Sequence, residues 1–161
     1  MKFDAPMVIH RSVVRPDWID WNGHMSVACY LVAFDAAGLA MLDLVGLDAN
    51  YRATTTGSTF ALDTRVVYLR EVKLDDPLRF DVHLIEYDQK RFHFMLRMLH
   101  DTENYVAALC QWISMHMDMS KRRGAPFPDH VLARLAAMHE AHRHLPVPDV
   151  LRRPIGLQRR A

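Results

Sequence analysis

The sequence predicts an α+β fold in which an antiparallel sheet of about five strands wraps around one long central helix. Residues 27–45 carry helix formers with apolar side chains on nearly every side, so other elements must enclose this helix. Four later segments are typical of β-strands, because apolar and polar residues alternate or, in the last segment, apolar residues fill both faces. Short polar linkers between them favour hairpins, which join antiparallel neighbours.

The predicted strands fall on both sides of the helix. Residues 8–15 are rich in Val and are expected to form a first strand. The four strands after the helix are expected at 59–71, 78–87, 91–99 and 105–118, joined by the linkers LDDP, EYDQK and HDTEN. On the 59–71 strand, Phe60, Leu62, Val66 and Tyr68 are expected to share the buried face.

A second helix is predicted near the C-terminus, over about 129–145, where Asp129 can cap an apolar stripe that includes Leu135 and Met138. The basic tail at 148–161 contains proline and is expected to be loosely ordered. The chain reads as one domain over residues 1–161, with a core at about 8–125. A strand, a helix and four strands make the hotdog architecture. A cone-shaped α+β fold is disfavoured because it has more helices ahead of its sheet.

The charge balance argues against nucleic acid and membrane partners. The 161 residues include 20 Lys and Arg against 19 Asp and Glu, so no global positive field draws the chain to nucleic acid or an anionic membrane. Asp35, Gly38 and Asp43 interrupt the long apolar stretch, which favours a buried helix over a membrane span. The N-terminus shows no signal peptide, and we expect a cytoplasmic protein.

A metal site is not expected. His139 and His142 lie on one side of the predicted C-terminal helix, but no third ligand follows at ordinary spacing, so a solvated face is favoured. Cys29 and Cys110 fall in apolar patterns, where a thiol behaves as a small apolar group. No metal or redox cofactor is therefore expected.

The segment DWIDWNGHMS, directly ahead of the long helix, is the candidate site. Asn22-Gly23 indicates a bend, because both residues tolerate a positive φ. Ser26 can cap a helix that begins at Val27. The amides at a helix N-terminus can receive a carbonyl oxygen and stabilise an oxyanion, so Asp20 stands beside a group that polarises an electrophile.

The stretch VRPDWIDWNGHMSVACYLVAFDAA resembles the D-x-x-G-H-x-N-x-x-x-Y segment of hotdog thioesterases of the 4-hydroxybenzoyl-CoA thioesterase type. Asp20, Gly23, His24, Ser26 and Tyr30 supply it, with Ser26 where the family usually has Asn, and the likeness extends over residues 8–125. Within the family, the sequence is similar to thioesterases of carnitine breakdown that act on betainyl-CoA.

The resemblance implies an acyl-CoA thioesterase that releases a carboxylate and coenzyme A (CoA). It assigns the attack on the carbonyl, or the activation of a water, to Asp20, and the oxyanion amide to Val27. His24 is either a general acid or a brace for the loop, and the second reading is favoured. Without the resemblance, Asp20 reads as an ordinary turn residue bonded to its own backbone. Asp63 is a second catalytic candidate.

Substrate contacts are predicted around this segment. A betainyl group ends in a trimethylammonium, which aromatic faces and a nearby carboxylate can hold. The aromatic candidates are Trp18, Trp21, Tyr30, Phe34, Phe60 and Trp112. Asp17 and Asp35 are candidate counter-charges, although Asp17 reads mainly as a solvated carboxylate. Arg122 and Arg123 are the leading candidates for the CoA phosphates, with Arg70, Lys90 and Arg91 as further candidates.

Several alternatives stay open at this point. The chain could be a silent acyl-CoA binder or sensor, or a general short-chain or aryl acyl-CoA thioesterase. A hotdog hydratase is disfavoured because its Asp/His placement is missing. We expect a homodimer or a dimer of dimers, because the two-sided apolar run VAALCQWISM indicates that another subunit covers the outer face of the sheet.

Overall fold

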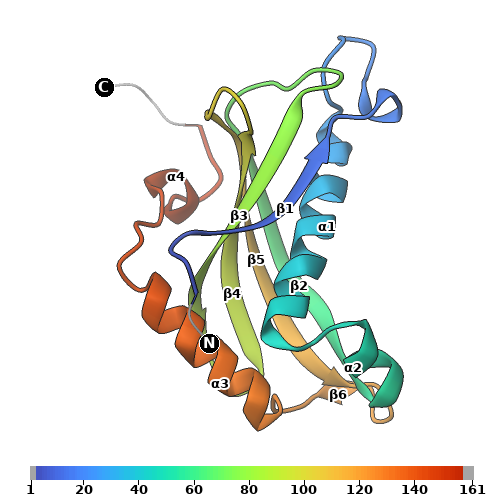
Figure 1. Ribbon diagram of the computed structural model, residues 1–161, viewed down its shortest axis with the longest axis vertical. Coiled ribbons are helices and arrows are strands. Elements are labelled where there is room, and N and C mark those ends of the chain that lie inside the picture. Colours follow the sequence, from blue (N-terminus) through green and yellow to red (C-terminus); the bar gives the residue numbers. More distant parts are fainter. Residues whose placement is uncertain (1–2, 158–161) are drawn as a thin grey trace.

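The computed structural model describes residues 3–157 and confirms the prediction of a sheet around a long helix (Figure 1). The strands are β1 (Met7–Val13), β2 (Gly57–Tyr68), β3 (Pro77–Tyr87), β4 (Arg91–His100), β5 (Val106–Asp118) and β6 (Arg123–Gly124). The α-helices are α1 (Val27–Val45), α2 (Ala49–Thr54), α3 (Asp129–His142) and α4 (Asp149–Arg152), and a 3-10 turn, η1, spans Pro16–Trp18.

The strands form one antiparallel sheet in the order β1-β3-β4-β5-β2, with β6 paired to the end of β5. The 13 residues of β5 and the 12 of β2 are long enough for the sheet to curl around α1. β2 is an edge strand, and its last residue lies at the same end of the sheet as the start of α1, since the Tyr68 hydroxyl donates to the Val27 carbonyl.

The core lies between α1 and the concave face of the sheet. Ala33, Phe34, Ala37 and Met41 are at most 2% exposed, and Phe34 packs edge-on against Phe80 with ring centroids 5.7 Å apart. By length and composition alone α1 could cross a membrane. Its inward side is instead the centre of this core, so α1 is the predicted buried helix.

A β-bulge between Ala61 and Asp63 changes which residues of β2 face α1. Before the bulge Phe60 is opposite Met115, and after it Thr64 is opposite Trp112, whose ring contacts Gly38 of α1. Side chains alternate along a strand, so Val66 and Tyr68 face α1 while Phe60 faces away. The prediction that Phe60 shares a face with Tyr68 is wrong, because the inserted residue reverses the alternation.

Helix α3 begins at Asp129, as predicted, and packs Val131, Leu135 and Met138 into the core. His142 does not belong to a solvated face. It is fully buried, with Nδ1 accepting the amide hydrogen of Leu84 at 3.0 Å and Nε2 lying 2.8 Å from the carbonyl of Asp4. Leu84 lies on β3 beyond the first residue of β1, where the edge of β3 is open. The imidazole therefore supplies a hydrogen bond that a neighbouring strand would otherwise make.

The C-terminal segment covers part of the convex face of the sheet. Leu151 of α4 is 4% exposed and packs with Met95 and Leu109, whose side chains point away from α1. The guanidinium of Arg65 anchors this segment by donating to the carbonyls of Leu151 and Arg153. Residues 149–152 are thus helical, contrary to the expected loose tail, and residues 158–161 of that tail lie outside the described residues. Val106 and Leu109, two of the apolar outer residues that suggested a covering subunit, pack against this segment of the same chain.

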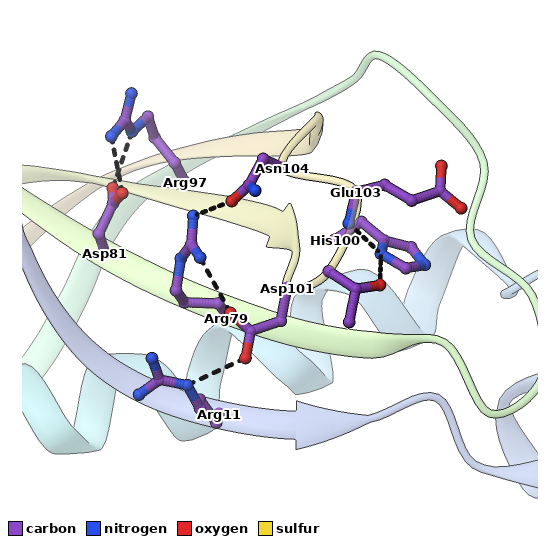
Figure 2. Close-up of polar contacts among 9 residues, drawn as sticks. Arg11, Arg79, Asp81, Arg97, His100, Asp101, Glu103 and Asn104 are labelled. Carbon is purple, nitrogen blue, oxygen red and sulfur yellow. Dashed lines mark hydrogen bonds and ion pairs between the residues drawn. The ribbon is translucent and has the colours of Figure 1, made fainter.

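A charged network ties the strands together on the same side as the turn between β4 and β5 (Figure 2). Arg97 binds the buried Asp81 through two hydrogen bonds of 2.8 and 2.7 Å. Arg79 and Arg11, from neighbouring strands, both donate to Asp101, at 2.9 and 3.0 Å. The network fixes the turn between β4 and β5. Tyr105, directly after this turn, donates to the carbonyl of Glu71, which lies next to the turn at residues 19–25.

Candidate active site

Asp20 lies in a tight turn directly ahead of α1. The turn is closed by a bridge between Ile19 and Met25 and by two backbone hydrogen bonds, from Asp20 to the His24 carbonyl at 2.9 Å and from Gly23 to the Asp20 carbonyl at 3.0 Å. Gly23 has a φ of +78°, which explains the glycine. Oδ1 of Asp20 accepts a hydrogen bond from the Asn22 amide at 2.8 Å, and this bond orients the carboxylate. The second oxygen, Oδ2, has no hydrogen-bond partner among the described residues.

The N-terminus of α1 follows this turn and begins at Val27, as predicted. Ser26 occupies the cap position with extended dihedrals, but its side chain makes no capping hydrogen bond. The expectation that its hydroxyl caps the helix is therefore wrong. The Cys29 amide donates to the Ser26 carbonyl at 2.9 Å, whereas the Val27 amide has no hydrogen-bond acceptor among the described residues and is free to bind an oxygen at the positive end of the helix.

Residues 71 and 72, which follow β2, hold the turn that carries Asp20. The Met25 amide donates to the carbonyl of Val72 at 3.0 Å, and Nε2 of His24 lies 2.9 Å from Oε2 of Glu71. His24 is therefore placed as a brace, because its ring joins the loop to a carboxylate 47 residues away in the sequence. Sequence reasoning did not find Glu71, since nothing near it in the sequence indicates a partner at His24.

Two tyrosines stand beside the first turn of α1. Tyr30 is 5% exposed, and its ring meets that of Tyr68 edge-on at 5.1 Å. The Tyr68 hydroxyl donates to the Val27 carbonyl at 3.3 Å, while 47% of the residue stays exposed. Burial raises the pKa of both phenols above the ordinary value of 10, so both are neutral at physiological pH. The sequence placed Tyr68 on the buried face of its strand but not at the site, because its contact with Val27 joins residues 41 positions apart.

Other predicted substrate residues lie elsewhere. Phe34 is fully buried against Phe80 and cannot touch a substrate, so its predicted role is corrected to that of a core residue. Trp21 is 92% exposed on the turn, with its ring in solvent. Arg122 and Arg123 are exposed at the start of β6, which lies at the opposite end of the sheet from the turn that carries Asp20 (Figure 1). Within one chain, the predicted CoA-binding arginines and Asp20 are not brought together.

The remaining carboxylate candidates also differ in place. Asp17 is exposed and paired with Arg15, whose hydrogen bond lowers the pKa of the carboxyl. Asp35 is exposed on α1 and lines a hollow of about 190 Å³ that includes Trp112. Asp63 is exposed and lines another hollow, with Gln111, on the convex side. Neither Asp35 nor Asp63 belongs to the turn that carries Asp20.

Within residues 3–157, no group of three or more His, Cys, Asp or Glu side chains is arranged to hold a metal ion. The chemistry available to the described part of the chain is that of a carboxylate beside an open helix terminus. This pairing suits attack on a carbonyl carbon whose oxygen is held by backbone amides.

The family model described as "Thioesterase-like superfamily" matches residues 14–135. The chain belongs to the thioesterase-like superfamily. The predicted hotdog fold and thioester hydrolase activity are thereby confirmed, and the turn that carries Asp20 and α1 lie inside the matched region.

Relatives of this thioesterase-like chain are similar over nearly its whole length. A betainyl-CoA thioesterase of Pseudomonas aeruginosa is 35% identical over 151 residues, covering 94% of this chain and 95% of the relative. An L-carnitine dehydrogenase/betainyl-CoA thioesterase of Rhizobium meliloti is 30% identical over 96% of this chain, which spans 31% of that longer protein.

Solved structures agree with the thioesterase fold. A putative thioesterase of Pseudomonas putida superposes with a TM-score of 0.82 at 29% identity, covering 96% of this chain and 98% of that one. A hypothetical protein of Staphylococcus aureus, solved in complex with CoA, gives a TM-score of 0.89 at 23% identity over 98% of this chain and 100% of its own. At that identity the second likeness concerns the fold.

Proposed function

We propose that this acyl-CoA thioesterase hydrolyses betainyl-CoA to betaine and free CoA. The observation that carries the proposal is the full-length similarity to a betainyl-CoA thioesterase together with the carboxylate of Asp20 beside the open N-terminus of α1. In the mechanism we propose, the Val27 amide receives the thioester oxygen, and Asp20 attacks the carbonyl carbon or activates a water. In direct attack, the C–S bond breaks to give a mixed anhydride on Asp20 and the CoA thiolate, and water then hydrolyses the anhydride to betaine. In the water route, Asp20 takes a proton from the attacking water, the C–S bond breaks, and the proton passes to the leaving thiolate.

We further propose that the working unit is a homodimer joined through β2. Val27, Leu31, Val32 and Leu39 expose 41–67% of their surface along α1, beside an edge strand that pairs on one side only among the described residues. A second copy is the natural cover for such an edge. A dimer of dimers would need a further surface, and the protein's cytoplasmic location stays a prediction.

Antiparallel pairing of two β2 strands would complete the site. Arg123 lies at the same end of the sheet as the start of β2, because Asp118 of β5 pairs with Gly57 on one side and with Arg123 on the other, whereas Tyr68 at the end of β2 contacts Val27. A two-fold axis across β2 would bring the start of one strand to the end of the other. Arg122 and Arg123 of one subunit would then approach Asp20 of the other and meet the CoA phosphates there.

The substrate proposal is tested by comparing betainyl-CoA with 3,3-dimethylbutyryl-CoA, a neutral thioester of the same shape. Thiol release is measured for both. Recognition of the cation worth about 1 to 2 kcal/mol predicts a preference for betainyl-CoA of about tenfold or more in kcat/KM. Equal or faster hydrolysis of the neutral ester would indicate a general short-chain thioesterase. Binding of both esters with no thiol release would indicate an acyl-CoA sensor.

A further inference from the structure

We propose that Tyr68 is the residue that selects a cationic acyl group, by presenting its ring to the trimethylammonium beside the oxyanion site. The inference rests on the proposed function, since it names the contact behind the substrate preference. It starts from the size of the acyl group. In a betainyl thioester one methylene separates the charged nitrogen from the carbonyl carbon, so any recognising group must lie close to the Val27 amide.

Tyr68 meets this requirement. Its hydroxyl donates to the Val27 carbonyl at 3.3 Å, which places the phenol oxygen within about 7.5 Å of the Val27 nitrogen by backbone dimensions alone. Almost half of the residue is exposed, so ring surface remains for a ligand. The edge-on contact with the buried Tyr30 fixes the ring from behind. A neutral phenol ring held in this way can attract a quaternary ammonium, which cannot donate a hydrogen bond.

The other aromatic candidates are excluded by their positions. Phe34 is fully buried, Tyr30 and Trp18 expose 5% and 8%, and Trp21 projects into solvent. Phe60 faces away from α1 because of the bulge. Trp112 lies near Gly38, which follows Val27 by 11 residues and is about 16 Å away along the helix axis. None of these residues has an exposed ring packed in place at the first turn of α1.

Two further groups are also excluded. Tyr105 is already covered by a cation, since the guanidinium carbon of Arg70 lies 3.7 Å from its ring centroid. Asp35 follows Val27 by eight residues and is therefore about 12 Å away along the helix axis, too far for a short acyl group bound in the same chain.

The test compares three variants by their ratio of kcat/KM for betainyl-CoA over 3,3-dimethylbutyryl-CoA. Tyr68→Leu removes the ring and is expected to lower this ratio about tenfold. Tyr68→Phe keeps the ring without the hydroxyl and is expected to hold the ratio within about threefold of wild type. Phe60→Leu, an exposed aromatic on the opposite face of the same strand, is the matched control and should leave the ratio unchanged.

The outcomes separate this inference from the proposed function. A wild-type enzyme that prefers betainyl-CoA and keeps its preference in Tyr68→Leu would overturn the assignment to Tyr68 while the function stands. A wild-type enzyme with no preference would overturn both. Because the ratio compares two substrates on one protein, a general loss of activity in a weakly folded variant cancels. If Tyr68→Leu does not fold, Tyr68→Ile, a β-branched residue suited to a strand, removes the ring and is expected to lower the ratio in the same way.

Discussion

In the proposed mechanism the carboxylate of Asp20 and the amide of Val27 act on different atoms of one carbonyl group, so neither can replace the other. Asp20→Asn preserves the Asn22 contact, because an amide oxygen can accept that hydrogen bond. It cannot serve as nucleophile or base, and kcat is expected to fall about 100-fold or more with acyl-CoA binding retained. Thiol release and calorimetric titration would measure the two effects. Turnover near the wild-type rate would reject the mechanism.

Ser26 belongs to the helix end by its backbone alone. Since its hydroxyl makes no capping hydrogen bond, Ser26→Ala is expected to change the free energy of unfolding by no more than about 0.5 kcal/mol. Urea denaturation would measure this change. A loss of about 1 kcal/mol, usual for a true cap, would show that the hydroxyl does bond an amide in solution.

Glu71 is expected to act through His24. Glu71→Ala frees the imidazole that joins the catalytic turn to the segment after β2, and kcat should fall about tenfold with KM little changed, because a displaced carboxylate attacks poorly. Glu71→Gln keeps an acceptor and should recover most of the rate. Glu103→Ala is the control, since Glu103 lines the same hollow as Glu71 without contacting His24. Additive losses in a His24→Ala/Glu71→Ala double variant would contradict this pathway.

At the scale of the elements, the buried imidazole of His142 joins α3 to the edge of β3. His142 must be neutral, because its Nδ1 accepts a hydrogen bond from Leu84. Burial lowers the pKa of His142, and burial with the nearby His142 lowers the pKa of His83 to about 4. Below pH 6.5 both histidines bind more protons in the unfolded state than in the folded state. Their contribution to the free energy of unfolding is therefore complete above pH 6.5 and is lost as the pH falls from 6.5 toward 4.

Thermal unfolding at pH 7 and pH 5 would measure this dependence. His142→Leu leaves the Leu84 amide and the Asp4 carbonyl without their partner and is expected to cost about 2 kcal/mol at pH 7. It should also flatten the pH dependence below 6.5. His144→Gln, an exposed residue two positions after His142, is the control and should change neither quantity. An unchanged pH profile in His142→Leu would place the acid sensitivity elsewhere.

For the whole molecule, the dimer through β2 can be tested by complementation. One variant carries Asp20→Asn and the other carries Arg122→Asn with Arg123→Ala, where Asn suits the φ of 48° at position 122. If the arginines serve the partner's Asp20, half of a random mixture is heterodimer with one intact site, and about a quarter of wild-type activity returns. No recovery after proven subunit exchange would show that each chain builds its own site.

The sequence was sufficient for features that depend on neighbours along the chain. The turn from Asp20 to His24 and the start of α1 at Val27 follow from Asn22-Gly23 and the apolar run after them. The alternation placed Tyr68 on the correct face of β2 but not Phe60, because the bulge between them has no clear sequence signature. The contacts of Tyr68 with Val27 and of Glu71 with His24 join distant segments, and no periodicity reveals them. Burial of His142 was missed for a similar reason, since the open edge of β3 that it fills exists only in the folded sheet.

The bulge at Leu62 gives β2 two independent halves. Residues before it and residues after it obey opposite rules for which side chains meet α1, although the strand is continuous in its pairing with β5. Deletion of Leu62 would let the residues paired with Ser114 and Ile113 follow one another directly, and the ladder would become regular with Tyr68 still facing α1. A shift of the later half by one residue would instead move Glu71 and Val72 as well as Tyr68, so the proposed selecting ring and the support of the Asp20 turn are tied to the same register.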